Sequence, residues 1–227
     1  QSAIALLVGP ELGKDEKVQR FFRGVAKLRP SAPRYDSTWD PKIVLRHLSN
    51  WYPNRELNLE SLTLKLVTLL ALVTGHRMQT LAAIDIRNIY RADENSLEIK
   101  IPDRIKTSSQ NKNQPVLRLP FFTRDKTICA ATTLLVYLER IKDIRGLINK
   151  LFISFKKPHK AVGTQTISRW IKKVMCKSGI DINVFSAYST RHASTSAAKR
   201  HGVNIDQIRK TAGWSKDSET FARFYDR

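Results

Sequence analysis

The sequence predicts a mainly α-helical protein with one small antiparallel β-sheet. Apolar residues recur every three or four positions along most of the chain, which is the period of an amphipathic helix. Helix-capping residues such as Asp40 and Gly75 separate these stretches. Only between Leu97 and Leu119 do apolar and polar residues alternate as they do in strands. These three observations define the expected fold class.

Residues 1–34 are expected to be the end of another domain, followed by a linker. Ser2 to Val8 predicts a short helix, and Asp15 to Leu28 predicts a longer one with apolar residues at helical spacing. Two prolines in the segment from Arg29 to Arg34 favour extended backbone. The main domain is therefore expected to cover residues 35–227.

Three helices are predicted in the first half of this main domain. The first begins at Asp40 and Pro41, an N-cap residue followed by a proline at the first helical position. The second opens at Asn58 or Ser61 and is apolar on most faces up to Val73, as a buried central helix would be. Gly75 ends it. A short helix then begins at Arg77.

A hairpin or small sheet is predicted next. Leu97, Ile99 and Ile101 alternate with polar residues, and the apolar pattern returns at Val116 after a polar turn. Lys106 lies just before that turn. A short strand is expected from Leu151 to Ser154. Further helices are predicted over residues 125–144, 164–177, 189–200, 205–212 and 218–225.

The charge of the chain points to a polyanionic partner. The 227 residues carry 40 Lys and Arg against 20 Asp and Glu, a net charge of +20. Such a surplus repels itself unless an anion offsets it, and nucleic acid is the expected polyanion. Hydrophobic residues make up 41% of the chain, enough for a globular core.

Composition and spacing exclude several classes of protein. Cys129 and Cys176 lie far apart and form no CxxC pair, so neither a zinc site nor a disulfide framework is predicted. No apolar run is long enough for a membrane span, and Ala3 to Val8 is too short for a signal peptide. The absence of paired carboxylates argues against a two-metal nuclease. We therefore expect an intracellular protein that needs no metal or cofactor.

Four short motifs place arginine, tryptophan and tyrosine along the chain: Thr74-Gly75-His76-Arg77, Tyr188-Ser189-Thr190-Arg191, Ala212-Gly213-Trp214 and Tyr225. Together they resemble the motifs of the tyrosine recombinases, the family of the phage integrases. The first is similar to that family's arginine box T-G-x-R, the second occupies the place of its H-x-x-R box, and the third is similar to its box with Gly and His or Trp. Tyr225 stands where the nucleophile is expected. The sequence of these motifs looks closest to eukaryotic mobile-element recombinases of the DIRS and Crypton types.

The chemistry of these residue types agrees with the resemblance. A phosphodiester in mid-transfer carries negative charge that planar guanidiniums can hold bidentately, the expected role of Arg77 and Arg191. Lys106, matched to the hairpin lysine of the family, would protonate the departing 5′ oxygen. Trp214 would donate its indole N–H to the phosphate. Lys100, Arg104 and Lys112 lie close enough in sequence to compete with Lys106 for its role.

Two positions depart from the family pattern. Tyr188 replaces a histidine and is a poor base at neutral pH, which predicts altered or weakened proton transfer. His192 could substitute, but one residue on from Arg191 it points about 100° away on a helix. Thr80 stands where an acidic residue is expected to orient Arg77, and the nearest acid is Asp85.

The resemblance implies a site-specific DNA recombinase that works through a covalent 3′-phosphotyrosyl intermediate at Tyr225. Its implied partners are double-stranded DNA and three further copies of the chain, as a homo-tetramer on two DNA sites, with a monomer possible without DNA. It implies a nuclear location, and residues 1–34 resemble the tail of the family's core-binding domain. Two alternatives stay open: a type IB topoisomerase, and a DNA-binding module that has lost catalysis.

Overall fold

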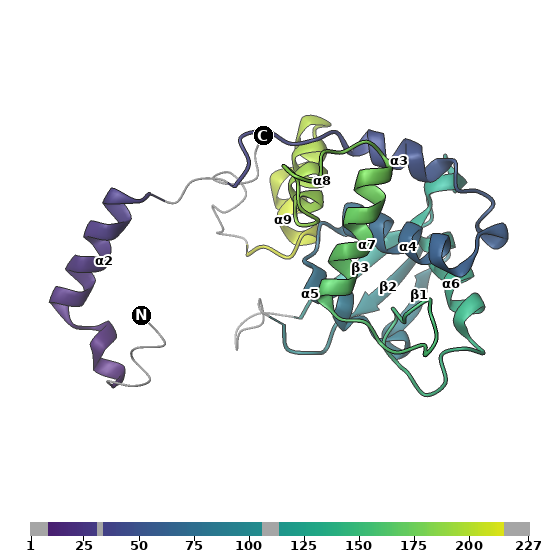
Figure 1. Cartoon of the computed structure of the whole chain (residues 1–227), viewed down its shortest axis with the longest axis horizontal. Coiled ribbons are helices and arrows are strands. Elements are labelled where there is room, and N and C mark those ends of the chain that lie inside the picture. The colour runs from purple at the N-terminus through teal and green to yellow at the C-terminus, as the bar shows by residue number, and fades with distance from the viewer. Residues whose placement is uncertain (1–8, 31–33, 106–113, 216–227) are drawn as a thin grey trace. The chain divides into compact units, whose positions relative to one another are not determined.

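The structure is a computed structural model that describes residues 9–30, 34–105 and 114–215. The chain divides into two compact units, Gln1–Asp36 and Ser37–Arg227. Figure 1 shows the helices and strands of both units along the chain.

In the described residues of the first unit, the main element is an amphipathic helix. A 3-10 turn, η1 (Pro10–Gly13), precedes α2 (Glu16–Leu28), and the Asp15 side chain caps α2 by accepting from the backbone N of Val18 at 3.0 Å. The helix predicted for this region is confirmed. The short helix predicted from Ser2 to Val8 lies outside the described residues.

The second unit is built around α4 (Leu59–Thr74). Asn58 is its N-cap, because its side chain accepts from the backbone N of Ser61 at 2.8 Å. Of its 16 residues, 12 are buried, which confirms the predicted central helix. α4 packs against α6 (Ala130–Ile141), α7 (Thr164–Lys177) and α8 (Ser189–Arg200). α3 (Pro41–Ser49), capped by Asp40 as predicted, also contacts α4 and α8.

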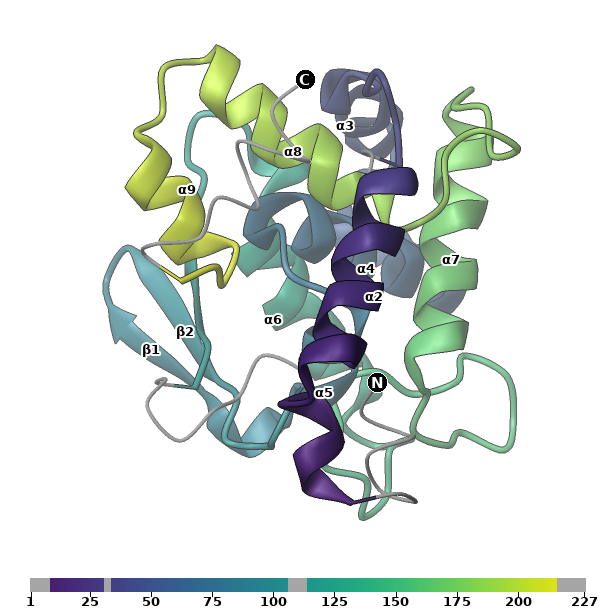
Figure 2. The same ribbon diagram turned by 90° about the vertical axis from the view of Figure 1, so that its left-hand side faces the viewer.

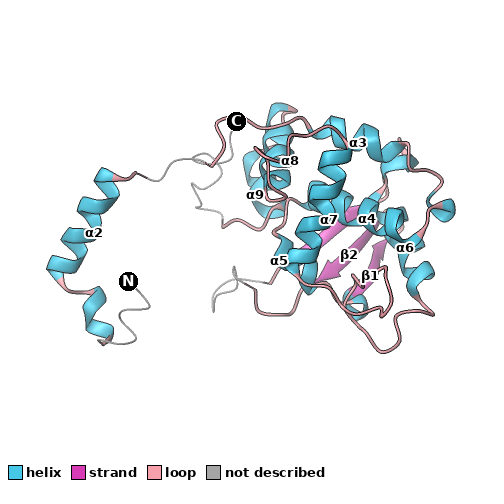
Figure 3. Cartoon of the chain, in the orientation of Figure 1, coloured by secondary structure: helices cyan, strands magenta, loops and turns pink. Residues whose placement is uncertain are grey.

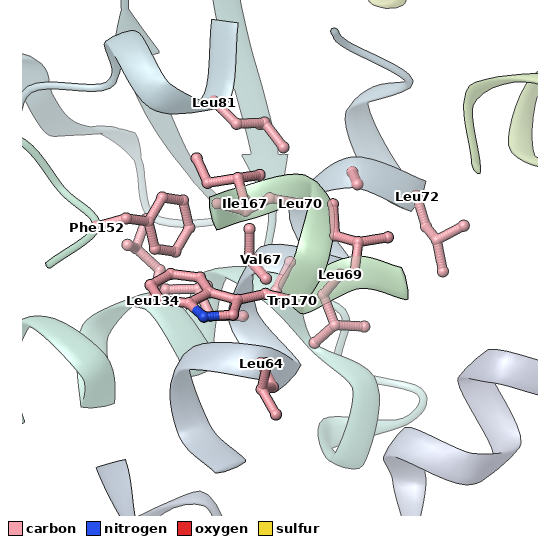
Figure 4. Packing of buried hydrophobic residues seen from close by; sticks show 14 of the residues in the cluster. Leu64, Val67, Leu69, Leu70, Leu72, Leu81, Leu134, Phe152, Ile167 and Trp170 are labelled. Carbon is pink, nitrogen blue, oxygen red and sulfur yellow. The ribbon is translucent and has the colours of Figure 1, made fainter. Parts of the chain in front are cut away.

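The core lies where α4 meets α6, α7 and the short α5 (Met78–Ala83). Figure 4 shows Val67 and Leu70 of α4 among Leu81, Leu134 and Ile167, with Phe152 and Trp170 beside them. All of these side chains are buried. Burial of such side chains stabilises the fold by roughly 1.5–3 kcal/mol each.

A three-stranded antiparallel sheet lies beside these helices, in the order β1 (Ile89–Asp93), β2 (Ser96–Lys100) and β3 (Val116–Pro120). Ile99 pairs with Leu117, and Leu97 pairs with Leu119; all four are buried. Strand β3 contacts α4 and α6, and Figure 3 shows the strands in magenta next to these helices. The fold is therefore mainly α with a small antiparallel sheet, as the sequence predicts.

Three local predictions were wrong. Strand β1 was missed because it is an edge strand with half-buried and exposed residues, so it lacks an alternating apolar pattern. α6 begins at Ala130 rather than Asp125, because Asp125 instead caps a 3-10 turn, η4 (Lys126–Ile128). The segment from Leu151 to Ser154 forms only an isolated bridge between Ile153 and Ala161.

The remaining predicted helices agree with the structure to within a residue or two. α7 and α8 have the predicted bounds, and α9 (Ile205–Thr211) ends one residue early. The two short 3-10 turns η2 (Asn54–Glu56) and η3 (Ile86–Asn88) were not predicted. The helix predicted over residues 218–225 lies outside the described residues.

Candidate functional site

The first arginine box forms the turn between α4 and α5. Gly75 adopts the left-handed conformation, with φ of 59°, which is why a glycine ends α4 here. The Thr74 hydroxyl donates to the carbonyl of Leu70 at 2.7 Å and accepts from the backbone N of His76 at 3.3 Å. Arg77 follows as the half-buried N-cap residue of α5.

The turn packs directly on α8, which carries the second box. A Cβ added at Gly75 would lie 3.3 Å from the Cγ2 of Thr195 and 3.4 Å from the Cβ of Ala212. Segments more than a hundred residues apart in sequence therefore meet at Gly75.

Arg191, on the first turn of α8, is the centre of this junction. It is 1% exposed, and its Nη1 donates to the carbonyls of Gly75 and of Ala212, the second at 2.7 Å. A buried guanidinium with fixed hydrogen bonds is held in one orientation. Its position is thus set jointly by the end of α4 and the end of α9.

Trp214 covers the guanidinium of Arg191. The central carbon of Arg191 lies 3.9 Å from the centroid of the Trp214 ring, within cation–π range. Gly213, with φ of 70°, turns the chain after α9, and the backbone N of Trp214 donates to the carbonyl of Arg209 at 2.8 Å. Trp214 packs in a small apolar cluster with Ile208 and Ala212. Figure 2 shows α8 and α9 next to one another.

His76, a residue of the first arginine box, packs against the turn that follows α9. It is 5% exposed, and a Cβ added at Gly213 would lie 2.8 Å from its Cε1. Burial first, and then the positive charges of Arg191 and Arg77, lower the pKa of His76 to about 3, against a hydrogen bond to the backbone of Thr211, which raises it. The fields of both guanidiniums therefore act on one neutral imidazole.

Tyr188 immediately precedes α8 and is half-buried. Its ring meets the ring of His192 edge to face, with 5.6 Å between their centroids. It also packs against the small cluster that contains Trp214. The tyrosine that replaces the expected histidine therefore lies beside a histidine and against the cluster that includes the stacking partner of Arg191.

Asp85, the acid considered as a partner of Arg77, forms no hydrogen bond or ion pair with it in the described residues. Asp85 instead binds Arg87, with 2.8 Å between Oδ2 and Nη2, and this hydrogen-bonded pair lowers the pKa of Asp85. Thr80 is buried, and its backbone N donates to the carbonyl of Arg77 at 2.9 Å. Within the described ranges, no hydrogen bond or ion pair involves the Arg77 side chain.

A further polar contact, which the sequence did not predict, fixes the position of the start of α8. The indole N–H of Trp39 donates to the hydroxyl of Ser189 at 2.8 Å, and that hydroxyl donates to the carbonyl of Ser186 at 2.7 Å. Trp39 is buried. Apolar spacing alone could not have indicated this pairing across 150 residues.

Lys106 and Tyr225 lie outside the described residues, so four of the six predicted site residues have described positions. Arg77, Tyr188, Arg191 and Trp214 all belong to the region where the α4–α5 turn, α8 and the end of α9 meet. In the part of the chain that the structure describes, no group of three His, Cys, Asp or Glu side chains could hold a metal ion. None of the helices within that part is long and apolar enough to cross a membrane.

The fold is that of tyrosine recombinase catalytic domains. The chain is similar to the XerA recombinase, with a TM-score of 0.58 and 20% identity over 88% of this chain and 61% of that one. It is similar to the XerH site-specific recombinase bound to its difH substrate, with a TM-score of 0.62 and 13% identity over 87% of this chain and 51% of that one. A lambda integrase dimer bound to a core site matches with a TM-score of 0.50 and 17% identity over 84% of this chain and 60% of that one.

Residues 47–227 match the phage integrase family, so the chain belongs to that family. No match was found among curated proteins. The chain spans about half to three-fifths of the length of the solved structures named above.

Proposed function

We propose that this chain cleaves and rejoins duplex DNA as a site-specific recombinase, with Tyr225 as the nucleophile. The observation that carries the proposal is the burial of Arg191, held by the carbonyls of Gly75 and Ala212 directly beside the Arg77 segment. Two guanidiniums at one junction suit the non-bridging oxygens of a phosphodiester, whose charge grows as the reaction proceeds. Family membership supports the same chemistry.

The proposed cleavage step is a displacement at phosphorus. The phenol oxygen of Tyr225 forms a bond to phosphorus, the bond from phosphorus to the 5′ oxygen breaks, and the phenol proton passes to water. Lys106 donates a proton to the 5′ oxygen as general acid. The product is a 3′-phosphotyrosyl bond and a free 5′ hydroxyl. Rejoining reverses the step, and no ATP is needed because the covalent bond conserves the energy.

Arg77 and Arg191 act differently in this proposal. Arg191 uses one nitrogen for two protein carbonyls, which fixes the plane of the guanidinium under Trp214. Arg77 is half-buried at the N-cap of α5, and within the described ranges its side chain forms no ion pair. It is therefore suited to bind an incoming phosphate rather than to support the fold.

Duplex DNA is the proposed partner, through the net charge of +20. The solved XerH structure is described as bound to its difH substrate, and that of lambda integrase as a dimer bound to a core site. By analogy with the dimer on one core site, we propose four copies of this chain on two DNA sites. From the resemblance of its motifs, we also propose that it acts in the recombination of a eukaryotic mobile element in the nucleus. Affinity should fall with salt, because most of it comes from phosphate contacts.

The test uses covalent trapping. Duplexes that the Tyr225→Phe variant binds are selected from a random-sequence pool, and a nick is introduced at successive positions. The unmodified chain should form a covalent complex stable to denaturant on one of these nicked duplexes, and Tyr225→Phe should not. If the unmodified chain binds these duplexes but forms no covalent complex, it is a DNA-binding module. If it relaxes plasmids at random sites, it is a topoisomerase.

A further inference from the structure

The residues that follow the two carbonyl partners of Arg191 contact each other. Arg191 donates to the carbonyls of Gly75 and Ala212, and the next residues along the chain are His76 and Gly213. The ring of His76 lies against Gly213 so closely that an added Cβ would be 2.8 Å from Cε1 and 3.4 Å from Nδ1. One contact therefore joins the two segments that orient Arg191.

His76 also has polar partners in both segments, one through its backbone and one through its ring. Its backbone N donates to the hydroxyl of Thr74 at 3.3 Å, and its ring is hydrogen-bonded to the backbone of Thr211. The ring thus bridges from the end of α4 to the last residue of α9. With 5% exposure, it has almost no contact with solvent.

A neutral side chain is favoured at this position, next to two arginines. His76 lies in the fields of Arg77 and Arg191, and its pKa is lowered to about 3, first by burial and then by these two cations. It is neutral at physiological pH. A lysine or arginine here would add a third positive charge to the junction, whereas a neutral ring can donate one hydrogen bond and still pack between cations.

We propose that His76 is a positioning residue of the recombinase reaction, which clamps the Thr211–Trp214 turn to the first arginine box and so fixes the Arg191 guanidinium under Trp214. The inference rests on the proposed function. In this role His76 acts through Arg191 and touches neither DNA nor the reacting atoms.

His76→Leu and His76→Gln in the full chain separate packing from hydrogen bonding. Leucine retains the apolar volume and loses the N–H, whereas glutamine offers an amide N–H in place of the ring donor. His201→Gln is the matched control, since His201 is an exposed histidine at the C-terminal end of α8. The rate of covalent complex formation on the nicked duplex, the half-saturating DNA concentration and the urea midpoint are measured for each.

For His76→Leu, we expect the saturating rate to fall by about 100-fold, as misplacement of a catalytic group does, with half-saturation within about threefold of the unmodified chain. His76→Gln should react about tenfold faster than His76→Leu, because one neutral hydrogen bond is restored. His201→Gln should match the unmodified chain. Gly213→Ala should reduce the rate by a smaller factor in the His76→Ala variant than in the unmodified chain. The reason is that alanine at position 76 removes the ring with which the new Cβ would clash.

Two results would overturn the inference alone while the unmodified chain still forms covalent complex: a His76→Leu rate within threefold of the control, or a loss of rate no larger than the unfolded fraction explains. If the unmodified chain forms no covalent complex on any bound duplex, the proposed function fails, and this inference fails with it.

Discussion

The guanidinium of Arg191 lies against the indole of Trp214, with 3.9 Å between the central carbon of Arg191 and the ring centroid. The same guanidinium donates to backbone carbonyls from the first arginine box and from the end of α9. Three segments that are distant in sequence therefore meet at one buried cation.

Replacing Arg191 with lysine should remove the planar contacts and retain the charge. A lysine cannot satisfy both carbonyls in the same geometry, so we expect the free energy of unfolding to fall by about 1–3 kcal/mol. Covalent complex formation should fall by about 100-fold or more, as when one donor to a developing oxyanion is removed. Urea denaturation and the nicked-duplex assay measure the two effects. A lysine variant that cleaves at the normal rate would contradict the assigned role of Arg191.

Trp214→Phe separates stacking from hydrogen bonding. Phenylalanine can still stack on Arg191, so the free energy of unfolding should change by no more than about 1 kcal/mol. If the indole N–H binds the phosphate, cleavage should fall by roughly ten- to a hundredfold, as expected for a hydrogen bond to a charged group. Trp214→Ala should lose both stability and rate. Equal rates for Trp214→Phe and the unmodified chain would limit Trp214 to packing.

Tyr188→His should restore the residue type that the family box has at this position. Histidine has an ordinary pKa near 6.5 against about 10 for tyrosine, so it can exchange protons near neutral pH. We expect cleavage at about pH 7 to rise by tenfold or more, within the range of general acid–base catalysis. Tyr188→Phe is the control for the ring contact with His192. If Tyr188→His cleaves more slowly than Tyr188→Phe, the side chain at position 188 takes no part in proton transfer.

His76 should make the fold sensitive to acid. Its pKa is lowered from 6.5 to about 3, so below about pH 6.5 the unfolded chain binds a proton that the folded chain does not. The contribution of His76 to stability is thus complete above pH 6.5 and is lost as the pH falls toward 3, with a slope of at most about 1.4 kcal/mol per pH unit.

Urea titrations of the unmodified chain and of His76→Gln between about pH 7 and pH 4 test this dependence, since glutamine does not titrate. The unmodified chain should lose more stability than the variant over this range. Parallel curves for the two proteins would show that His76 is not kept neutral by burial and by the two arginines.

Much of the fold could be predicted from sequence, because local signals specify it. The caps Asp40, Asn58 and Gly75 and the helical periods placed α3, α4, α7 and α8 to within a residue or two. Strand β1 was missed because an exposed edge strand carries no periodic apolar signal. The start of α6 was misplaced because a 3-10 turn capped by Asp125 carries the same signal as a helix start.

The sequence by itself determined the residue types available to the site: two arginines, a lysine, a tryptophan and a terminal tyrosine in the order of the family boxes. Only the tertiary structure decided that Arg191 is held by Gly75 and Ala212, that Asp85 binds Arg87 instead of Arg77, and that His76 packs on Gly213. Spacing along a chain specifies which face of a helix a residue occupies. Which carbonyl or ring from another segment meets that face depends on how the helices pack, and that packing is set by the core as a whole.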